Sequence, residues 1–263
     1  MNSDREVKLQ PMTPIEIITS SLRYYRQNFH ELFVLVIPGF AVWLIIFLFV
    51  FRYDASAPPT EPLQDTGAHQ LYAALALFVF LFISAVITAV GTIAISGQFV
   101  EKELNVGKTF MRAMDIGFPL LGTLTLFTAG ITVGLWLFVI PGIIVYVWFC
   151  MAPPVVTIEG EGGLGALKRS RAVVKDYFNK AFLIVIPAAI LEIVLAWCVL
   201  FLPNLFGKLF FLHHLLLSAV FAILLMLSAP FKIVATTMLY YDLRIRKEGF
   251  DLQSLSEEFA ASP

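Results

Sequence analysis

The chain has 263 residues, of which 59% are hydrophobic and 14% are charged, with a net charge of −1. Soluble domains are about 45–50% apolar and about 25% charged, so this composition excludes a water-soluble enzyme domain, a disordered chain and a secreted disulfide scaffold. The near-neutral charge also gives no global field that would favour nucleic acid. The apolar residues gather in runs of about 20, the length that a helix needs to cross a bilayer. We therefore predict an all-α, polytopic membrane protein.

In chain order, six apolar runs predict membrane spans at residues 32–51, 71–100, 118–140, 142–158, 181–202 and 209–241. Spans three and four are separated only by Pro141-Gly142. We predict a tight hairpin there, because one helix over both runs would be about 60 Å long. Pro230 lies inside the sixth run, where a kink and a freed carbonyl are expected. Residues 1–253 are predicted to form a single membrane domain, followed by a flexible cytoplasmic tail over residues 254–263.

The positive charges are distributed unevenly about these spans. Of the 18 Lys and Arg residues, all except Arg52 and Lys208 fall near the chain ends or in the connections that follow spans two and four. By the positive-inside rule, both termini and these connections are cytoplasmic. The polar N-terminal segment lacks the features of a cleaved signal peptide, so the first span is expected to insert uncleaved. We predict a multi-pass protein of the cell (inner) membrane.

A short amphipathic segment precedes each odd-numbered span, at residues 13–30, 105–115 and 163–180. The first opens with Thr13, Pro14 and Glu16, which predict a helix cap with a reciprocal Thr–Glu capping box. Aligning Pro38 with Pro187 superimposes the first and third segments without a gap and pairs Ser21 with Ser170, Phe29 with Phe178, Phe33 with Phe182 and Ile37 with Ile186. We therefore predict three repeats, each an interfacial amphipathic helix followed by a helical hairpin.

The cations on these segments are candidates for contact with anionic lipid headgroups. They are Arg23, Arg26, Lys108, Arg112, Lys168, Arg169 and Lys175. Each exposed cation near a membrane surface adds about 1 kcal/mol of attraction to anionic lipid. Membrane lipids are thus the predicted partners, with a membrane protein partner that the sequence does not identify. The alternative is that these cations only set the topology and brace the bundle.

Small residues follow one face of two spans. They are Ser84, Thr88, Thr92 and Ser96 in the second span, and Gly130 and Gly134 in the third. Such stripes are typical of closely packed membrane helices. A hydrophilic pathway lined by the hydroxyl groups is the alternative.

Glu192 is the most informative single residue, because it lies about 18 Å into the fifth span from its cytoplasmic end. A carboxylate at that depth costs about 2.5–3.5 kcal/mol and needs a partner or a raised pKa. Lys232 lies about 15 Å into the antiparallel sixth span, at a matching depth. The two form a candidate intramembrane pair, either structural or coupled to a proton or substrate. Alternatively, Lys232 extends to the interface and leaves Glu192 protonated.

The sequence contains no phosphate-binding glycine loop, no HExxH motif and no GxSxG motif. Cys150 and Cys198 lie in apolar runs, where we expect buried thiols, and His213-His214 point to different faces of a helix and make a poor metal site. We therefore predict no enzyme activity, no cofactor, no metal and no nucleic-acid partner. The aromatic residues expected to anchor at the membrane interface are Trp43, Tyr72, Trp197, Tyr240 and Tyr241.

Four segments resemble one family of prokaryotic membrane proteins. They are LYYDLRIRKEGFD (239–251), IPGI (140–143), APPVV (152–156) and GALKRS (165–170). They are similar to the glycerophosphoryl diester phosphodiesterase membrane domain, and the resemblance covers most of residues 13–253. It implies a six-helix membrane module that is sometimes fused to a soluble phosphodiesterase, whose catalytic barrel this sequence lacks. Many relatives carry an Arg-Trp pair in the fourth span, where this chain has Trp148-Phe149.

The tail motif of this resemblance is Tyr241, Asp242, Arg244 and Arg246. Asp242 is expected to pair with Arg246 four residues later, and Gly249 to end the helix. From all of these features we predict a non-enzymatic integral membrane module that organises lipids or partner proteins at the cytoplasmic leaflet. The alternative is a small transporter or lipid translocator that uses the Glu192–Lys232 site.

Overall fold

The computed structural model describes residues 11–34, 37–38, 41, 66–99, 106–205 and 211–249. Every regular element in these ranges is a helix, so the predicted all-α fold is confirmed for them. Within these ranges, three helical segments are long and apolar enough to cross a membrane, namely Thr109–Leu137, Val139–Glu159 and Gly163–Leu195. Most of the first predicted span lies outside the described residues.

Helix α1 (Pro14–Gln27) begins with the predicted capping box, which is confirmed. The Thr13 amide donates to Glu16 Oε2 at 2.6 Å, and the Glu16 amide donates to Thr13 Oγ1 at 3.3 Å. The hydrogen bond from the Thr13 backbone also lowers the pKa of Glu16. Asn28 caps the other end, and a further helical stretch follows over residues 29–34.

Helix α3 (Thr66–Phe99) carries the predicted stripe of small polar residues. The hydroxyl groups of Thr88, Thr92 and Ser96 each donate to the carbonyl four residues earlier in the same helix. Thr92 and Ser96 are also buried among the packed helices. Because these hydroxyls are satisfied within α3, the stripe supports close packing rather than a hydrophilic pathway.

Helix α4 (Val106–Leu137) runs without a break through Pro119. The predicted interfacial segment 105–115 and the third span are therefore one helix, and the predicted boundary between them is wrong. A proline inside a helix removes one backbone hydrogen bond and often bends the helix, but it does not have to end it.

Helix α5 (Val139–Phe149) folds back on α4, with Gly134 against Gly142 and Gly130 against Val145, so the predicted hairpin is confirmed. The turn is at Phe138, whose backbone is extended, and not at Pro141-Gly142 as predicted. The predicted turn is displaced because proline fits the first turn of a helix, where Pro141 now lies. Gly142 has a packing role instead: a Cβ added to Gly134 would lie 2.8 Å from the Gly142 Cα, so the two backbones approach closely.

Beyond α5 the chain forms α6 (Ala152–Pro154), the π-helix η1 (Val155–Glu159), α7 (Gly163–Val174), the 3₁₀ turn η2 (Lys175–Tyr177) and α8 (Phe178–Leu205). Gly160, with φ of 74°, ends η1 in a left-handed conformation that favours glycine. Because η2 joins α7 directly to α8, the predicted interfacial segment 163–180 continues into the fifth span.

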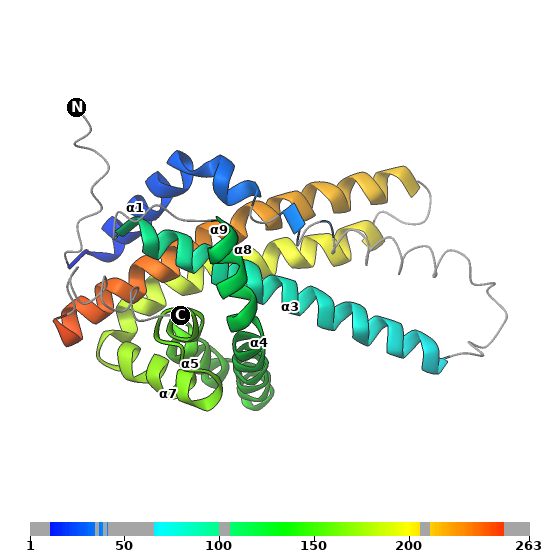
Figure 1. Ribbon diagram of the computed structural model, residues 1–263. Coiled ribbons are helices and arrows are strands. Elements are labelled where there is room, and N and C mark those ends of the chain that lie inside the picture. The colour runs from blue at the N-terminus through cyan, green and yellow to red at the C-terminus, as the bar shows by residue number, and fades with distance from the viewer. Residues whose placement is uncertain are drawn as a thin grey trace.

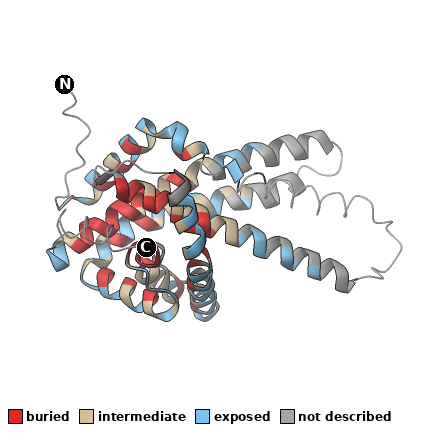
Figure 2. Cartoon of the chain, viewed as in Figure 1, coloured by how far each residue is buried: buried red, intermediate tan, exposed pale blue. Residues whose placement is uncertain are grey.

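Helix α9 (Phe211–Glu248) returns antiparallel to α8 (Figure 1). Pro230 does not end it, and the Tyr25 hydroxyl of α1 donates to the Leu227 carbonyl in the turn before this proline. Gly249, with φ of 64°, ends the helix as predicted. Figure 2 shows that the buried residues gather around the C-terminal half of α9, whereas the N-terminal half of α3 extends away from this core and its described side chains are largely exposed.

Tyr240 and Tyr241 lie inside this core, with 0% and 1% of their surface exposed. The prediction that they anchor at the membrane interface is therefore wrong. They lie in the C-terminal part of α9, where Ser21 of α1 contacts Met238 and Lys247 contacts Ala172 of α7, so neighbouring helices cover them. Trp197 on α8 is exposed, as an interface anchor requires, whereas the side chains of Trp43 and Tyr72 lie outside the described part of the chain.

Candidate functional site

Helix α1 has three distinct sides. Ile17, Ser21 and Tyr24 are buried in the core against α9. A stripe of large apolar side chains remains exposed, consisting of Ile15, Ile18 and Leu22 of α1 and Phe29 just after its cap. At 3.6 residues per turn, this apolar stripe lies between the buried side and the exposed cations Arg23 and Arg26. An apolar stripe bordered by cations is typical of a helix that lies in a membrane interface.

The seven predicted headgroup cations occupy different environments. Arg23, Arg26, Lys168 and Lys175 are exposed, Arg112 is half-buried on α4, and the side chain of Lys108 lies outside the described residues. Arg169 differs from the others, because it forms ion pairs within the protein. Its predicted role at lipid headgroups is not supported by this position.

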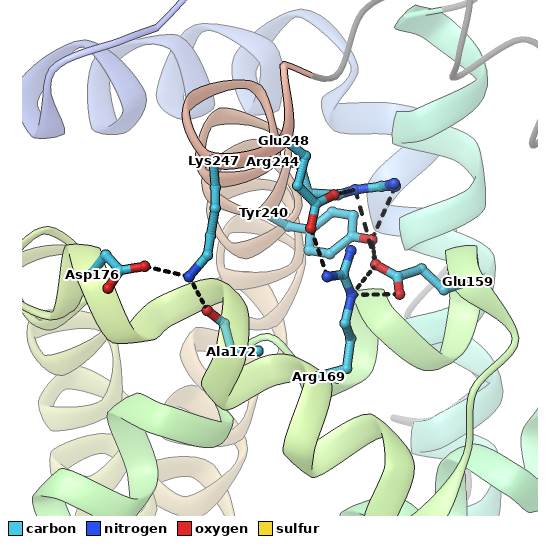
Figure 3. Close-up of polar contacts among 8 residues, drawn as sticks. All are labelled: Glu159, Arg169, Ala172, Asp176, Tyr240, Arg244, Lys247 and Glu248. Carbon is cyan, nitrogen blue, oxygen red and sulfur yellow. Dashed lines mark hydrogen bonds and ion pairs between the residues drawn. The ribbon is translucent and has the colours of Figure 1, made fainter.

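Arg169 lies at the centre of a charged network, which we call the α7–α9 network (Figure 3). Its Nε contacts Glu159 of η1 at 2.8 Å, and its second donor group contacts Glu248 at the end of α9 at 2.6 Å. Arg244 contacts Glu248 at 3.0 Å, and the Tyr240 hydroxyl donates to Glu159 at 2.5 Å. Two arginines and two glutamates thus link η1, α7 and α9 by alternating charges.

Two opposing effects act on the pKa of Glu248 in this network. Burial alone would raise its pKa, but the hydrogen bonds from Arg169 and Arg244 outweigh burial and lower the pKa below its ordinary value. The carboxylate therefore stays ionised in the folded protein. Beside the network, Lys247 donates to the Ala172 carbonyl and to Asp176 of η2, which adds a second link between α9 and the segment preceding α8 (Figure 3).

Asp242 of the tail motif is the centre of a second network and has no exposed surface. It pairs with Arg246 at 3.1 Å, the predicted partner four residues later. It also accepts a hydrogen bond from Lys180 of α8 and one from the Met12 amide at 2.6 Å. Asp242 therefore ties the residue before the α1 cap to both helices of the α8–α9 hairpin.

The structure brings Glu192 and Lys232 together. Lys232 Nζ of α9 donates to Glu192 Oε2 of α8 at 2.5 Å. The Lys232 and Glu192 side chains are 35% and 25% exposed, so the pair lies at the edge of the helix bundle rather than deep in the core. The geometry can hold a charge pair between the two helices, and it leaves part of the pair accessible.

We compared the chain with protein-family models, with curated proteins and with solved structures. None of the three comparisons gives a match. The resemblance to the glycerophosphoryl diester phosphodiesterase membrane domain therefore stays a prediction. Of its tail motif, Tyr241, Asp242 and Arg244 are buried at the centre of the fold, and Arg246 is exposed beside Asp242. Among the described residues, no group of three His, Cys, Asp or Glu side chains could hold a metal ion.

The sequence patterns do not predict the contacts of Glu159, Arg171 and Trp148. Glu159 follows an apolar run directly, a signal that could have suggested a buried carboxylate in need of a cation. The charge distribution assigns Arg171 only to the cytoplasmic side, whereas the structure places its guanidinium over the Trp148 ring. The contact between Arg171 and Trp148 joins α7 to α5, and no local spacing rule predicts contacts between residues that far apart in the sequence.

Proposed function

We propose that the protein is a non-enzymatic integral membrane module that organises anionic lipids at the cytoplasmic leaflet. The observation that carries this proposal is the exposed apolar stripe of α1 with Arg23 and Arg26 along its edge. In water such a stripe is unfavourable, whereas at a membrane interface it enters the acyl region while the cations meet the headgroups. The core holds α1 by the neighbouring side with Ile17, Ser21 and Tyr24, so that the stripe is fixed in its outward orientation.

We further propose six spans in three repeats, with both termini in the cytoplasm of the cell (inner) membrane. Support comes from the alignment of the first and third amphipathic segments, because residues that this alignment pairs are buried in both. The pairs are Ile17 with Ala166, Ser21 with Ser170, Tyr24 with Val173, and Leu32 with Ala181. An impermeant maleimide tests the topology in intact cells. It should label Gln64→Cys and not Ser254→Cys; labelling of both would contradict the arrangement.

The lipid function is tested by purifying the full chain from membranes with equal phosphatidylglycerol and phosphatidylcholine. Mass spectrometry then measures the anionic fraction of the retained lipid. We expect enrichment of phosphatidylglycerol, and a clear reduction in the double variant Arg23→Gln/Arg26→Gln. The control Arg52→Gln/Lys208→Gln removes the same charge from the predicted opposite side and should retain the enrichment. No enrichment in the unaltered protein would overturn the proposal.

A second candidate function is transport through a site at Glu192 and Lys232. The partly exposed charge pair between α8 and α9 favours it. Ionisable groups in membrane segments often lie on proton or substrate pathways. Liposomes loaded with a pH-sensitive dye would reveal a proton flux that Glu192→Gln abolishes. If both proteins leave the liposomes equally tight, the pair is structural.

A further inference from the structure

Helix α7 and the start of α8 expose one continuous stripe of side chains. Its members are Leu164, Lys168, Arg171, Lys175, Asn179 and Phe182. They follow one another at three or four residues, the spacing that places side chains on one face of a helix. The stripe is apolar at both ends and carries three cations between them, so it matches the boundary between acyl chains and headgroups.

Arg171 is the cation of this stripe that contacts an aromatic ring. Its guanidinium carbon lies 4.4 Å from the centre of the Trp148 ring on α5. A cation over an indole face is attracted by the ring, and the guanidinium still has N–H groups at its edge that can donate. The adjacent Ser170 fixes the position, since its hydroxyl donates to the Trp148 carbonyl at 2.8 Å and accepts from the Met151 amide at 3.1 Å.

The ion pairs around this stripe are made by other cations. In the part of the chain that the structure describes, Lys168, Arg171 and Lys175 make no ion pair. Asp176 follows Lys175 directly and attracts it, but the ion pair of Asp176 is with Lys247. Two flexible lysines therefore flank a guanidinium that is held in place, and all three can face one anionic ligand. Planar guanidinium groups bind phosphate oxygens in pairs, which makes a phosphodiester the fitting ligand class.

We propose that Arg171, positioned by Trp148 and flanked by Lys168 and Lys175, binds the phosphodiester of an anionic lipid headgroup. This inference rests on the proposed lipid function and names one site for it. It differs from general surface attraction, because it depends on one oriented guanidinium more than on total charge. Arg169, two residues away, does not take part, because Glu159 and Glu248 already engage it.

Isothermal titration of the full chain in a neutral detergent tests the site. The probes are dihexanoyl phosphatidylglycerol, dihexanoyl phosphatidylcholine and inorganic phosphate. We expect Arg171→Gln to weaken phosphatidylglycerol binding about tenfold, as for the loss of one charge-assisted contact. Arg171→Lys keeps the charge and loses the paired donors, so it should also weaken binding several-fold. It replaces Arg171→Gln as the test if that variant does not fold. Arg23→Gln is the matched control on α1 and should change binding less than twofold.

Each outcome has a defined meaning. Equal weakening by Arg171→Gln and Arg23→Gln overturns the site and leaves the proposed lipid function intact. Full binding by Arg171→Lys likewise overturns a site built on guanidinium geometry. Inorganic phosphate that binds as tightly as phosphatidylglycerol overturns the lipid as the ligand. Equal binding of the two lipids by the unaltered chain overturns both the site and the broader proposal.

Discussion

Replacing Arg169 with methionine tests whether the α7–α9 network holds η1, α7 and the end of α9 together. Arg169 contacts Glu159 at 2.8 Å and Glu248 at 2.6 Å. Methionine keeps much of the side-chain volume and removes the charge and all five donors. The network then holds two carboxylates with Arg244 as the remaining arginine. Loss of Arg169 therefore weakens packing between elements that are far apart in the sequence.

The size of the effect follows from the exposure of these side chains. Arg169, Glu159 and Glu248 are 28%, 14% and 27% exposed. Fully exposed ion pairs contribute about 0.2–1 kcal/mol, whereas removing one partner of a buried pair costs about 3–5 kcal/mol. The network lies between these limits, and Arg244 still neutralises part of the charge. We expect Arg169→Met to lower the free energy of unfolding by about 2 kcal/mol.

The free energy of unfolding is measured by titrating the protein in mixed micelles with dodecyl sulfate and following the far-ultraviolet circular dichroism. Lys168→Met is the matched control, because it removes an exposed cation from the next position on α7 and should cost less than about 0.5 kcal/mol. Glu248→Gln should cost less in the Arg169→Met background than alone, since the two residues share one interaction. Equal losses for Arg169→Met and Lys168→Met would refute the reasoning.

Three further predictions use the same assay or a thermal one. Gly134→Ala should lower the free energy of unfolding by about 1–3 kcal/mol, because its new Cβ would lie 2.8 Å from the Gly142 Cα. Gly122→Ala, with nothing within 4 Å, should be neutral or stabilising by up to about 1 kcal/mol; equal results would contradict the close approach. Glu248 has a depressed pKa in the folded protein, so its contribution is present above its ordinary pKa of 4.5 and is lost as the pH falls through the folded value. Glu248→Gln should therefore flatten the acid side of the melting temperature profile, and an unchanged profile would disprove this linkage. Asp242→Asn should cost about 3 kcal/mol, since it leaves cations around a fully buried group without their carboxylate; a loss below about 1 kcal/mol would speak against this network.

Features with local causes could be predicted from the sequence. The capping box of Thr13 and Glu16 depends on three residues of spacing, and the Asp242–Arg246 pair on four. The hairpin between α4 and α5 was also predictable, because a helix of their combined length has no place in a bilayer. Its turn was predicted three residues too late, since proline and glycine also serve the first turn of a helix.

Features that depend on distant segments could not be predicted in this way. Tyr240 and Tyr241 are near the end of an apolar run, a position typical of interface anchors. They are buried because α1 and α7 pack around the same end of α9, and no property of α9 alone indicates this. Glu192 and Lys232 are an intermediate case. The two residues lie at similar depths in antiparallel helices, which makes a contact possible. The contact also requires both side chains to face each other, which depends on how each helix is rotated about its axis.

Arg169 and Arg171 illustrate the same limit within one helix. Residues two positions apart point to different sides of a helix, about 200° apart, so these two arginines cannot have equivalent surroundings. The charge distribution predicts a cytoplasmic position for both arginines, and only Arg169 is among the predicted headgroup cations. Burial of Ser170 and Val173 fixes the rotation of α7 about its axis. In this orientation Arg169 lies beside Glu159, and Arg171 lies over the Trp148 ring. Arg169 is a structural link because Glu159 and Glu248 bind it. Arg171 makes no ion pair with a described residue, so its N–H groups can donate to a ligand. The paired comparison of Arg169→Met in unfolding with Arg171→Gln in lipid binding therefore separates stability from recognition on a single turn of α7.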